Sequence, residues 1–182
     1  MIDFIKKIRR KIIASSKKRK AQKRCYRLGI EYADGVFVGE NVRKWGTVKV
    51  ILGKNVRIGS NTIFWGNGII TIGDNSHIGE DSWIYANSNG GVTIGSDVNI
   101  AARLYLIDSN HKFERGTLIR KQGLESACVS IGNDVWIAAN VTIIKGANIG
   151  DGCVVGAASL VNKSFPDYSV IGGVPAKILK MR

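Results

Sequence analysis

Pairs of apolar residues recur through the second half of the chain with a period of six. In each pair a small or medium-sized residue is followed two positions later by a larger aliphatic residue. This alternation is typical of a short β-strand that buries one face. Glycines and Asn-Asp or Asp-Gly steps between the pairs favour turns. The pattern predicts strands at Val129/Ile131, Val135/Ile137, Val141/Ile143, Ala147/Ile149, Cys153/Val155 and Ser159/Val161.

The same pairs occur upstream in groups of three. Three hexads suit one coil with three flat sides, and a short regular repeat of this kind is the signature of a parallel β-helix. We therefore predict an all-β fold, a three-sided parallel β-helix over residues 36–182 that ends in a short C-terminal segment. The upstream pairs are Val36/Val38, then Val50/Leu52, Val56/Ile58 and Thr62/Phe64, then Ile70/Ile72, Ser76/Ile78 and Ser82/Ile84, then Val92/Ile94, Val98/Ile100 and Leu104/Leu106.

The spacing between successive groups shows where the chain leaves this pattern. From Val129 to Ala147 it is 18 residues, but it is 20 from Val50 to Ile70, 22 from Ile70 to Val92 and 37 from Val92 to Val129. Each excess follows the third hexad of its group, so the insertions are expected to stack at one corner, on coils about 4.8 Å apart. Because loops on a rigid scaffold commonly carry function, this corner is the candidate site.

The insertions contain the residues with useful chemistry. The second contains Asn87, and the third, an excursion over residues 107–128, contains Asp108 and His111. An imidazole is the usual general base near neutral pH, and an amide can donate to or accept from a hydroxyl group. We predict that His111 is catalytic and that Asn87 and Asp108 contact the acceptor. Either Asp108 or a backbone carbonyl group is expected to orient the second ring nitrogen of His111.

Charge is concentrated at the N-terminus. Residues 1–27 hold twelve Lys or Arg and one acidic residue, whereas the rest of the chain is nearly neutral. Within the predicted tail, residues 1–35, Phe4, Ile5, Ile8 and Ile12 recur at helical spacing among these charges. Such a basic amphipathic helix can lie on an anionic membrane or pack against its own domain or a sister subunit. Nucleic-acid binding is not expected, because nucleic-acid-binding folds usually spread basic and aromatic residues through the body.

Composition excludes several classes of protein. The three cysteines form no CxxC motif, so a disulfide framework is not expected and a reducing compartment fits. With two histidines, one chain cannot supply a three-histidine metal site, and we expect no metal. Neither a signal peptide nor an apolar stretch of about 18 residues is recognisable. We expect a cytoplasmic protein, with peripheral attachment to the membrane through the tail as one alternative.

Three strings carry a resemblance to a known family: Ile131–Ile137 (IGNDVWI), Val155–Val161 (VGAASLV) and Gly172–Lys177 (GGVPAK). With Asn110-His111 after the Ile94–Ala101 segment, they make residues 36–182 resemble the left-handed β-helix, or hexapeptide-repeat, acyltransferases. The most similar branch contains the maltose, galactoside and polysaccharide O-acetyltransferases. The left hand of the coil is implied by the resemblance alone, since periodicity cannot reveal it.

The resemblance also implies a site and an assembly. His111 falls on the family's catalytic histidine and Asn87 on its acceptor-binding asparagine. Family members are homotrimers that bind acetyl-CoA, the acyl donor, between adjacent prisms. Two departures are notable: Ala139 stands where a hydroxyl residue is frequent, and the loop after Asn87 is short and lacks an acidic residue. The positions that fall on the cofactor groove are Trp136, Ala139, Ala157, Asn162, Lys163, Lys177 and Lys180.

The expected activity is O-acetyl transfer from acetyl-CoA to a hydroxyl group of a sugar or polysaccharide precursor, with His111 as general base. An N-acetyltransferase acting on an amino sugar shares this scaffold, and a non-catalytic β-helix is the alternative from another class. The identity of the acceptor stays open, as does that of the small acyl group.

Overall fold

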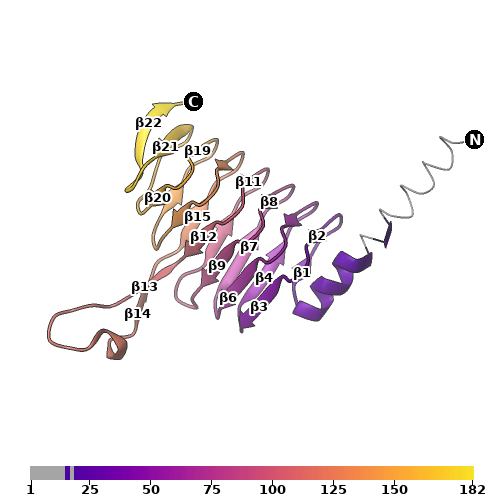
Figure 1. Cartoon of the computed structure of the whole chain (residues 1–182), viewed down its shortest axis with the longest axis horizontal. Coiled ribbons are helices and arrows are strands. Elements are labelled where there is room, and N and C mark those ends of the chain that lie inside the picture. The colour runs from indigo at the N-terminus through magenta and orange to yellow at the C-terminus, as the bar shows by residue number, and fades with distance from the viewer. Residues whose placement is uncertain (1–14, 17–18) are drawn as a thin grey trace, which may run out of the picture.

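The computed structural model describes residues 15–16 and 19–182. Within them the chain winds as a stack of parallel coils whose strands form three flat sheets, one on each side of a prism (Figure 1). The period-six prediction of an all-β, three-sided parallel β-helix is confirmed. Sheet A contains β1 (Glu31–Tyr32), β4 (Lys49–Leu52), β7 (Ile69–Ile72), β10 (Val92–Ile94), β15 (Val129–Ile131) and β18 (Asn148–Ile149).

The other two sheets complete the prism. Every neighbouring pair in them is parallel except β21 and β22, which are antiparallel. Sheet B contains β2 (Phe37–Val38), β5 (Arg57–Ile58), β8 (His77–Ile78), β11 (Asn99–Ile100), β16 (Trp136–Ile137), β19 (Val154–Val155), β21 (Ser169–Gly172) and β22 (Lys177–Met181). Sheet C contains β3 (Arg43–Gly46), β6 (Ile63–Gly66), β9 (Trp83–Ala86), β12 (Tyr105–Ile107), β17 (Thr142–Ile143) and β20 (Leu160–Val161).

The core consists of the predicted hexad residues. Each inward position stacks on its equivalent in the next coil, as Ile58, Ile78, Ile100 and Ile137 do along sheet B. These side chains are fully buried, so the hydrophobic effect holds the coils in register. Cys153 occupies one of these small inward positions and is buried too.

Two of the three corners turn on short, repeated segments. The residue at the turn has positive φ and is mostly Asn or Asp, the side chains that tolerate this conformation best. The carboxamide of Asn55 donates to Asn75 at 3.0 Å, and that of Asn75 donates to Asp97 at 3.0 Å, so the turn side chains form a ladder along the corner. The third corner, between sheets C and A, carries the insertions instead.

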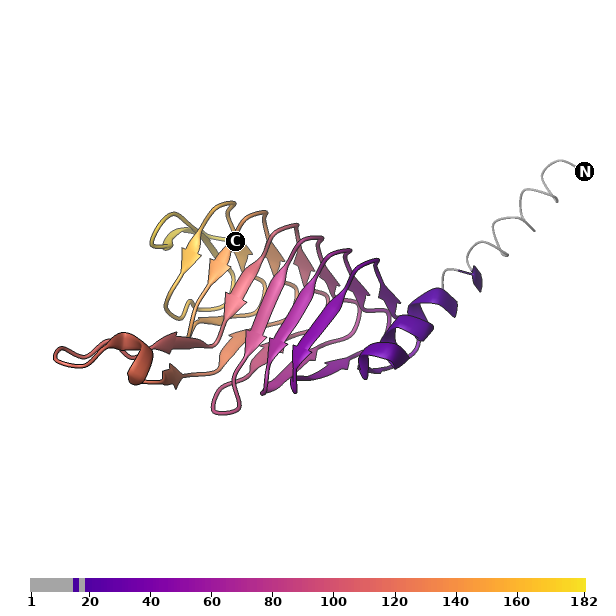
Figure 2. The ribbon, with the colours of Figure 1, turned by 60° about the horizontal axis from the view of Figure 1, so that its bottom comes forward.

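A helix over residues 19–28 covers the N-terminal end of the prism (Figures 1 and 2). Its Ala21 and Cys25 are fully buried, and its Arg24 guanidinium donates to the carbonyl oxygen of Val38 at 2.7 Å. The β-helix begins directly afterwards, because β1 at Glu31 pairs with β4. The first strand therefore lies within residues 1–35, which the sequence assigned to the tail. The apolar stripe of Phe4, Ile5, Ile8 and Ile12 lies outside the described residues.

Candidate active site

The three insertions all leave the prism between sheets C and A, as the spacing predicted. They follow β6, β9 and β12, and the longest projects from the prism as a ribbon (Figure 2). They are also joined to one another: the N–H of Ser88 donates to the side-chain oxygen of Asn67 at 2.9 Å, and the N–H of Asn87 donates to the Asp108 carboxylate at 2.8 Å. The insertions of three consecutive coils therefore form one hydrogen-bonded structure at this corner.

The Asp108 carboxylate holds the loop of Asn87 in place. Its two oxygens accept the N–H of Asn87 at 2.8 and 3.0 Å, and one of them accepts the N–H of Gly91 at 2.6 Å. The side chain is fully buried, and this desolvation raises the pKa of Asp108 although the hydrogen bonds from Asn87 and Gly91 act to lower it. Gly90 is required here because a Cβ at that position would run into the Asp108 carboxylate.

This arrangement corrects the role predicted for Asp108. A fully buried carboxylate whose oxygens are taken by backbone amides of the adjacent coil is not exposed to an acceptor, and its hydrogen bonds do not go to His111. Asp108 instead positions the backbone that carries Asn87. The sequence could not indicate this, because its partners Asn87 and Gly91 lie on the preceding coil.

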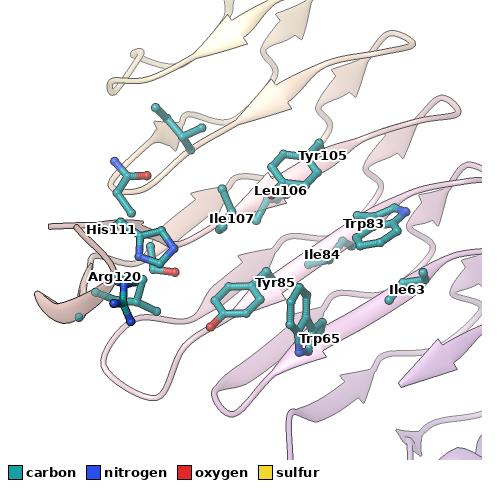
Figure 3. A pocket seen from close by; sticks show the side chains of 15 residues that line it. Ile63, Trp65, Trp83, Ile84, Tyr85, Tyr105, Leu106, Ile107, His111 and Arg120 are labelled. Atoms are coloured by element: carbon teal, nitrogen blue, oxygen red, sulfur yellow. The ribbon is translucent and has the colours of Figure 1, made fainter. Parts of the chain in front are cut away.

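His111 lies on a two-stranded antiparallel ribbon made by β13 (Ser109–His111) and β14 (Leu124–Ser126). His111 is paired with Leu124, and its exposed side chain lies beside Arg120 of the short 3₁₀ helix η1 (Ile119–Lys121) (Figure 3). The base of the ribbon is tied to the prism by an ion pair between Glu125 and Lys145. The imidazole is therefore presented at the corner by regular structure.

A cavity of about 590 Å³ opens in front of His111. The walls come from the outer face of sheet C and from the ribbon, and His111 and Arg120 lie at the ribbon end (Figure 3). Aromatic side chains dominate the sheet wall: Trp65, Trp83, Tyr85 and Tyr105. These residues were not predicted from the sequence, although they occupy the outward positions of the third hexads, where the alternation would have revealed them.

The loop of Asn87 reaches the same corner, but its side chain does not line this cavity. The carboxamide oxygen of Asn87 accepts the N–H of Asn89 at 3.2 Å, so the loop is closed on itself. Asn87 and His111 therefore lie on neighbouring excursions that Asp108 connects. Their side chains do not line the same cavity.

The positions expected to line the cofactor groove lie in two separate regions of the prism surface. Trp136 points outward from sheet B and is 55% exposed. Ala139 and Ala157 occupy successive turns between sheets B and C, where the N–H of Ala158 donates to the carbonyl oxygen of Ala139 at 3.0 Å. The exposed Lys177 and Lys180 lie on β22, on the same side as Trp136, whereas the exposed Asn162 and Lys163 follow β20 at the corner between sheets C and A.

Among residues 15–16 and 19–182, no three His, Cys, Asp or Glu side chains lie together as a metal site would require. No helix in the same residues is long and apolar enough to cross a membrane.

Comparisons with known proteins agree with this geometry. The family model "bacterial transferase hexapeptide (six repeats)" matches residues 128–163, and "hexapeptide repeat of succinyl-transferase" matches residues 49–79 and 69–107. The putative lipopolysaccharide biosynthesis O-acetyl transferase WbbJ of Escherichia coli is 42% identical over 54% of this chain and 54% of its own length. The galactoside O-acetyltransferase of the same organism is 40% identical over 49% of this chain and 43% of its own length. The chain thus spans about half the length of these curated relatives.

Solved structures match over more of the chain. AntD, an N-acyltransferase from Bacillus cereus crystallised with dTDP and 3-hydroxybutyryl-CoA, superposes with a TM-score of 0.77 at 26% identity and covers 88% of both chains. The polySia-specific acetyltransferase NeuO, at 23% identity and a TM-score of 0.61, shares the fold. With its repeats, its corner insertions and these matches, the chain is a hexapeptide-repeat protein with the left-handed β-helix fold, and it is similar to acyltransferases of that fold.

Proposed function

We propose that the protein transfers an acetyl group from acetyl-CoA to a hydroxyl group of a sugar or polysaccharide precursor. The observation that carries this proposal is the placement of His111, which a tethered ribbon holds at one end of a cavity large enough for a small-molecule substrate. The similarity to two O-acetyltransferases supports the reaction and the class of acceptor.

In this mechanism His111 acts as the general base. Its imidazole takes the proton from the acceptor hydroxyl group while the oxygen attacks the thioester carbonyl carbon of the donor. A backbone N–H near the donor stabilises the negative charge that develops on the carbonyl oxygen. The carbon–sulfur bond then breaks, the acetyl ester is released, and the coenzyme A thiolate recovers a proton from the imidazolium. Asn87 lies on the neighbouring excursion, outside the wall of the His111 cavity, and its contact with the acceptor stays a prediction.

The donor fits a groove between two copies of the chain better than a groove on one. Trp136, Lys177 and Lys180 lie on one side of the prism, and Asn162 and Lys163 lie at a different corner. Two copies placed side by side bring one edge of each together, which is the arrangement of a homotrimer with three sites. The exposed lysines supply charge for the phosphate groups of coenzyme A, and Trp136 supplies an apolar surface.

An N-acyltransferase is the second candidate, because AntD matches over 88% of both chains. The same base and donor then act on an amino group. A thiol-release assay with acetyl-CoA separates the candidates when it offers matched pairs of acceptors: glucose against 2-amino-2-deoxyglucose, and galactose against its 2-amino form. We expect thiol release and a new ester with the hydroxyl acceptors. Release with the amino sugars alone, giving an amide, would establish the N-acyl alternative, and no transfer either to these sugars or to oligosaccharides built from them would contradict both.

The basic N-terminal tail determines where the enzyme would be found in the cell in this proposal. Helix residues 19–28 cap the prism with Ala21 and Cys25 while Lys20, Lys23 and Arg27 stay exposed. We propose a cytoplasmic enzyme whose basic N-terminal segment binds the anionic membrane surface peripherally, each Lys or Arg contributing about 1 kcal/mol near such a surface. A trimer presents three of these segments, and their joint binding is stronger than that of one.

A further inference from the structure

Two columns of aromatic side chains run along the outer face of sheet C toward His111. In the first, Trp45 pairs with Trp65 and Trp65 with Tyr85, and the next coil places Ile107 in register. The second, beside it, consists of Ile63, Trp83 and Tyr105 in successive coils. The ribbon that carries His111 leaves the prism directly after Ile107.

These rings form a connected and accessible surface. Trp45, Trp65, Trp83 and Tyr105 are 39%, 46%, 40% and 45% exposed, so each keeps a substantial part of its side chain open to solvent. Ring centroids lie 6.2 Å apart for Trp45 and Trp65 and 5.4 Å apart for Trp65 and Tyr85, in edge-to-face contact. Edge-to-face contact is one of the geometries that aromatic pairs prefer. Exposed apolar side chains that are contiguous, and not scattered singly, often mark a binding site.

We propose that this face, named here the aromatic platform (Trp45, Trp65, Trp83, Tyr85 and Tyr105), binds an extended saccharide chain and feeds it to His111. The inference deepens the proposed function, on which it rests, by assigning the acceptor to oligosaccharides and polysaccharides instead of single sugars. The apolar C–H faces of sugar rings stack on aromatic rings, and the indole N–H and phenol O–H groups of the platform hydrogen-bond to sugar hydroxyl groups.

Continuity with the cavity favours a saccharide over other occupants. Four of the five platform residues line the same cavity as His111, and Trp45 extends the surface by one further coil. A chain lying along the columns therefore reaches His111 without crossing a break in the surface. Arg120, at the His111 end of the cavity, offers up to five N–H donors to the sugar being modified. The competing occupant is a second copy of this chain, covering the platform as a subunit interface.

Binding is measured first, without a donor, on an array of defined saccharides that includes chains of one to six sugars, using the full-length protein. Affinities for the tightest saccharide and its shortened forms are then measured by calorimetry. Trp65→Ala and Trp45→Ala are compared with the wild type and with Tyr26→Ala, which removes an 86% exposed aromatic side chain from the N-terminal helix. Circular dichroism and sedimentation velocity accompany every variant, and Trp65→Phe serves as the conservative replacement.

The proposal expects affinity to rise with chain length. Both alanine variants should weaken binding of the longest chain about five- to tenfold without affecting binding of the single sugar, while Trp65→Phe and Tyr26→Ala bind like the wild type. Binding that ignores chain length, an absence of binding on the array, or wild-type affinity in both alanine variants would overturn it. A change of oligomeric state in folded Trp65→Ala would also overturn it and assign the face to a subunit interface.

The proposed reaction is separately testable. Length-dependent binding without thiol release from acetyl-CoA would retain the platform and refute the transferase proposal. Transfer to single sugars that is equal to transfer to long chains, in the wild type and in Trp65→Ala alike, would retain the transferase and refute the platform.

Discussion

The carboxylate of Asp108 and the backbone N–H of Asn87 are joined across neighbouring coils by hydrogen bonds of 2.8 and 3.0 Å. The same carboxylate accepts the N–H of Gly91 at 2.6 Å, and Asp108 immediately precedes the ribbon that carries His111. One buried side chain thereby connects the two excursions that contain the predicted acceptor-binding and catalytic residues.

Asp108→Asn tests this connection. The carboxamide has one accepting oxygen, and its N–H₂ group faces an N–H donor, so a buried amide loses its partner. We expect the free energy of unfolding to fall by about 1–3 kcal/mol, measured by denaturant titration. We also expect KM for the acceptor to rise more than kcat falls, because the loop of Asn87 is displaced while His111 is retained. An unchanged stability would contradict the role assigned to Asp108.

His111→Ala is expected to lower kcat about 10²–10⁴-fold, since general-base catalysis typically contributes this much. The thermal midpoint should stay near that of the wild type, because His111 is exposed on the ribbon. His77→Ala, which removes the other histidine from an outward position of sheet B, is the matched control and should retain activity. Wild-type turnover in His111→Ala would remove this residue from the mechanism.

The three cysteines should react at different rates with a thiol reagent. Cys128 is exposed, whereas Cys25 and Cys153 are buried. Burial also raises the pKa of Cys25 to about 11 and raises that of Cys153, so neither forms the reactive thiolate readily at neutral pH. In Cys128→Ser, labelling of Cys25 therefore reports opening of the helix over residues 19–28. Rapid labelling of Cys25 in the folded protein would show that this helix does not stay packed on the prism.

The Cys25 thiol also has a consequence for alkaline stability. Its pKa in the folded protein lies above the ordinary value of 9.0. The folded state therefore keeps this proton at a pH where the unfolded chain has released it. As a result, the free energy of unfolding falls as pH rises from about 9 to about 11. Cys25→Ala should flatten this part of a plot of stability against pH.

We expect the protein to sediment as a homotrimer at micromolar concentration. Trp136 is half-exposed on sheet B, and the expected donor-binding positions are divided between two edges of the prism. Trp136→Ala should raise KM for acetyl-CoA or shift the sedimentation profile toward monomer. A wild-type monomer with full activity would refute the shared site.

Membrane binding by the tail is tested with anionic and neutral vesicles. Full-length protein should pellet with the anionic vesicles and be released by salt, because surface charges are screened within about 10 Å at 0.1 M salt. The truncated variant for this test should begin at Arg19. A chain that begins at Leu28 would lose the buried Ala21 and Cys25, which pack against the prism. The truncated protein should remain folded and active and stay in the supernatant. Equal pelleting of both chains would contradict the membrane proposal.

Several features followed from the sequence because they are local or strictly periodic. Each hexad turns one aliphatic pair into the core, so the six-residue repeat predicts the prism directly, and the three excess spacings predict that the insertions share a corner. His111 was predicted to be catalytic on the same basis, as an imidazole in an insertion outside the aliphatic pattern, and the structure places it at that corner. The left-handed sense of the coil was predicted only from the family resemblance, because right- and left-handed coils have the same periodicity.

Other features depend on which residues face each other from different coils. The partners of Asp108 lie 21 and 17 positions earlier in the chain, and only the register of the coils shows that the Asp108 carboxylate is buried against them. The aromatic platform likewise needs the pairing of β3, β6, β9 and β12, since insertions of unequal length hide its columns in the sequence. The division of the donor-binding positions between two edges is set by the prism itself. Local alternation determines which residues are buried, and the tertiary stacking of coils decides which exposed residues become neighbours.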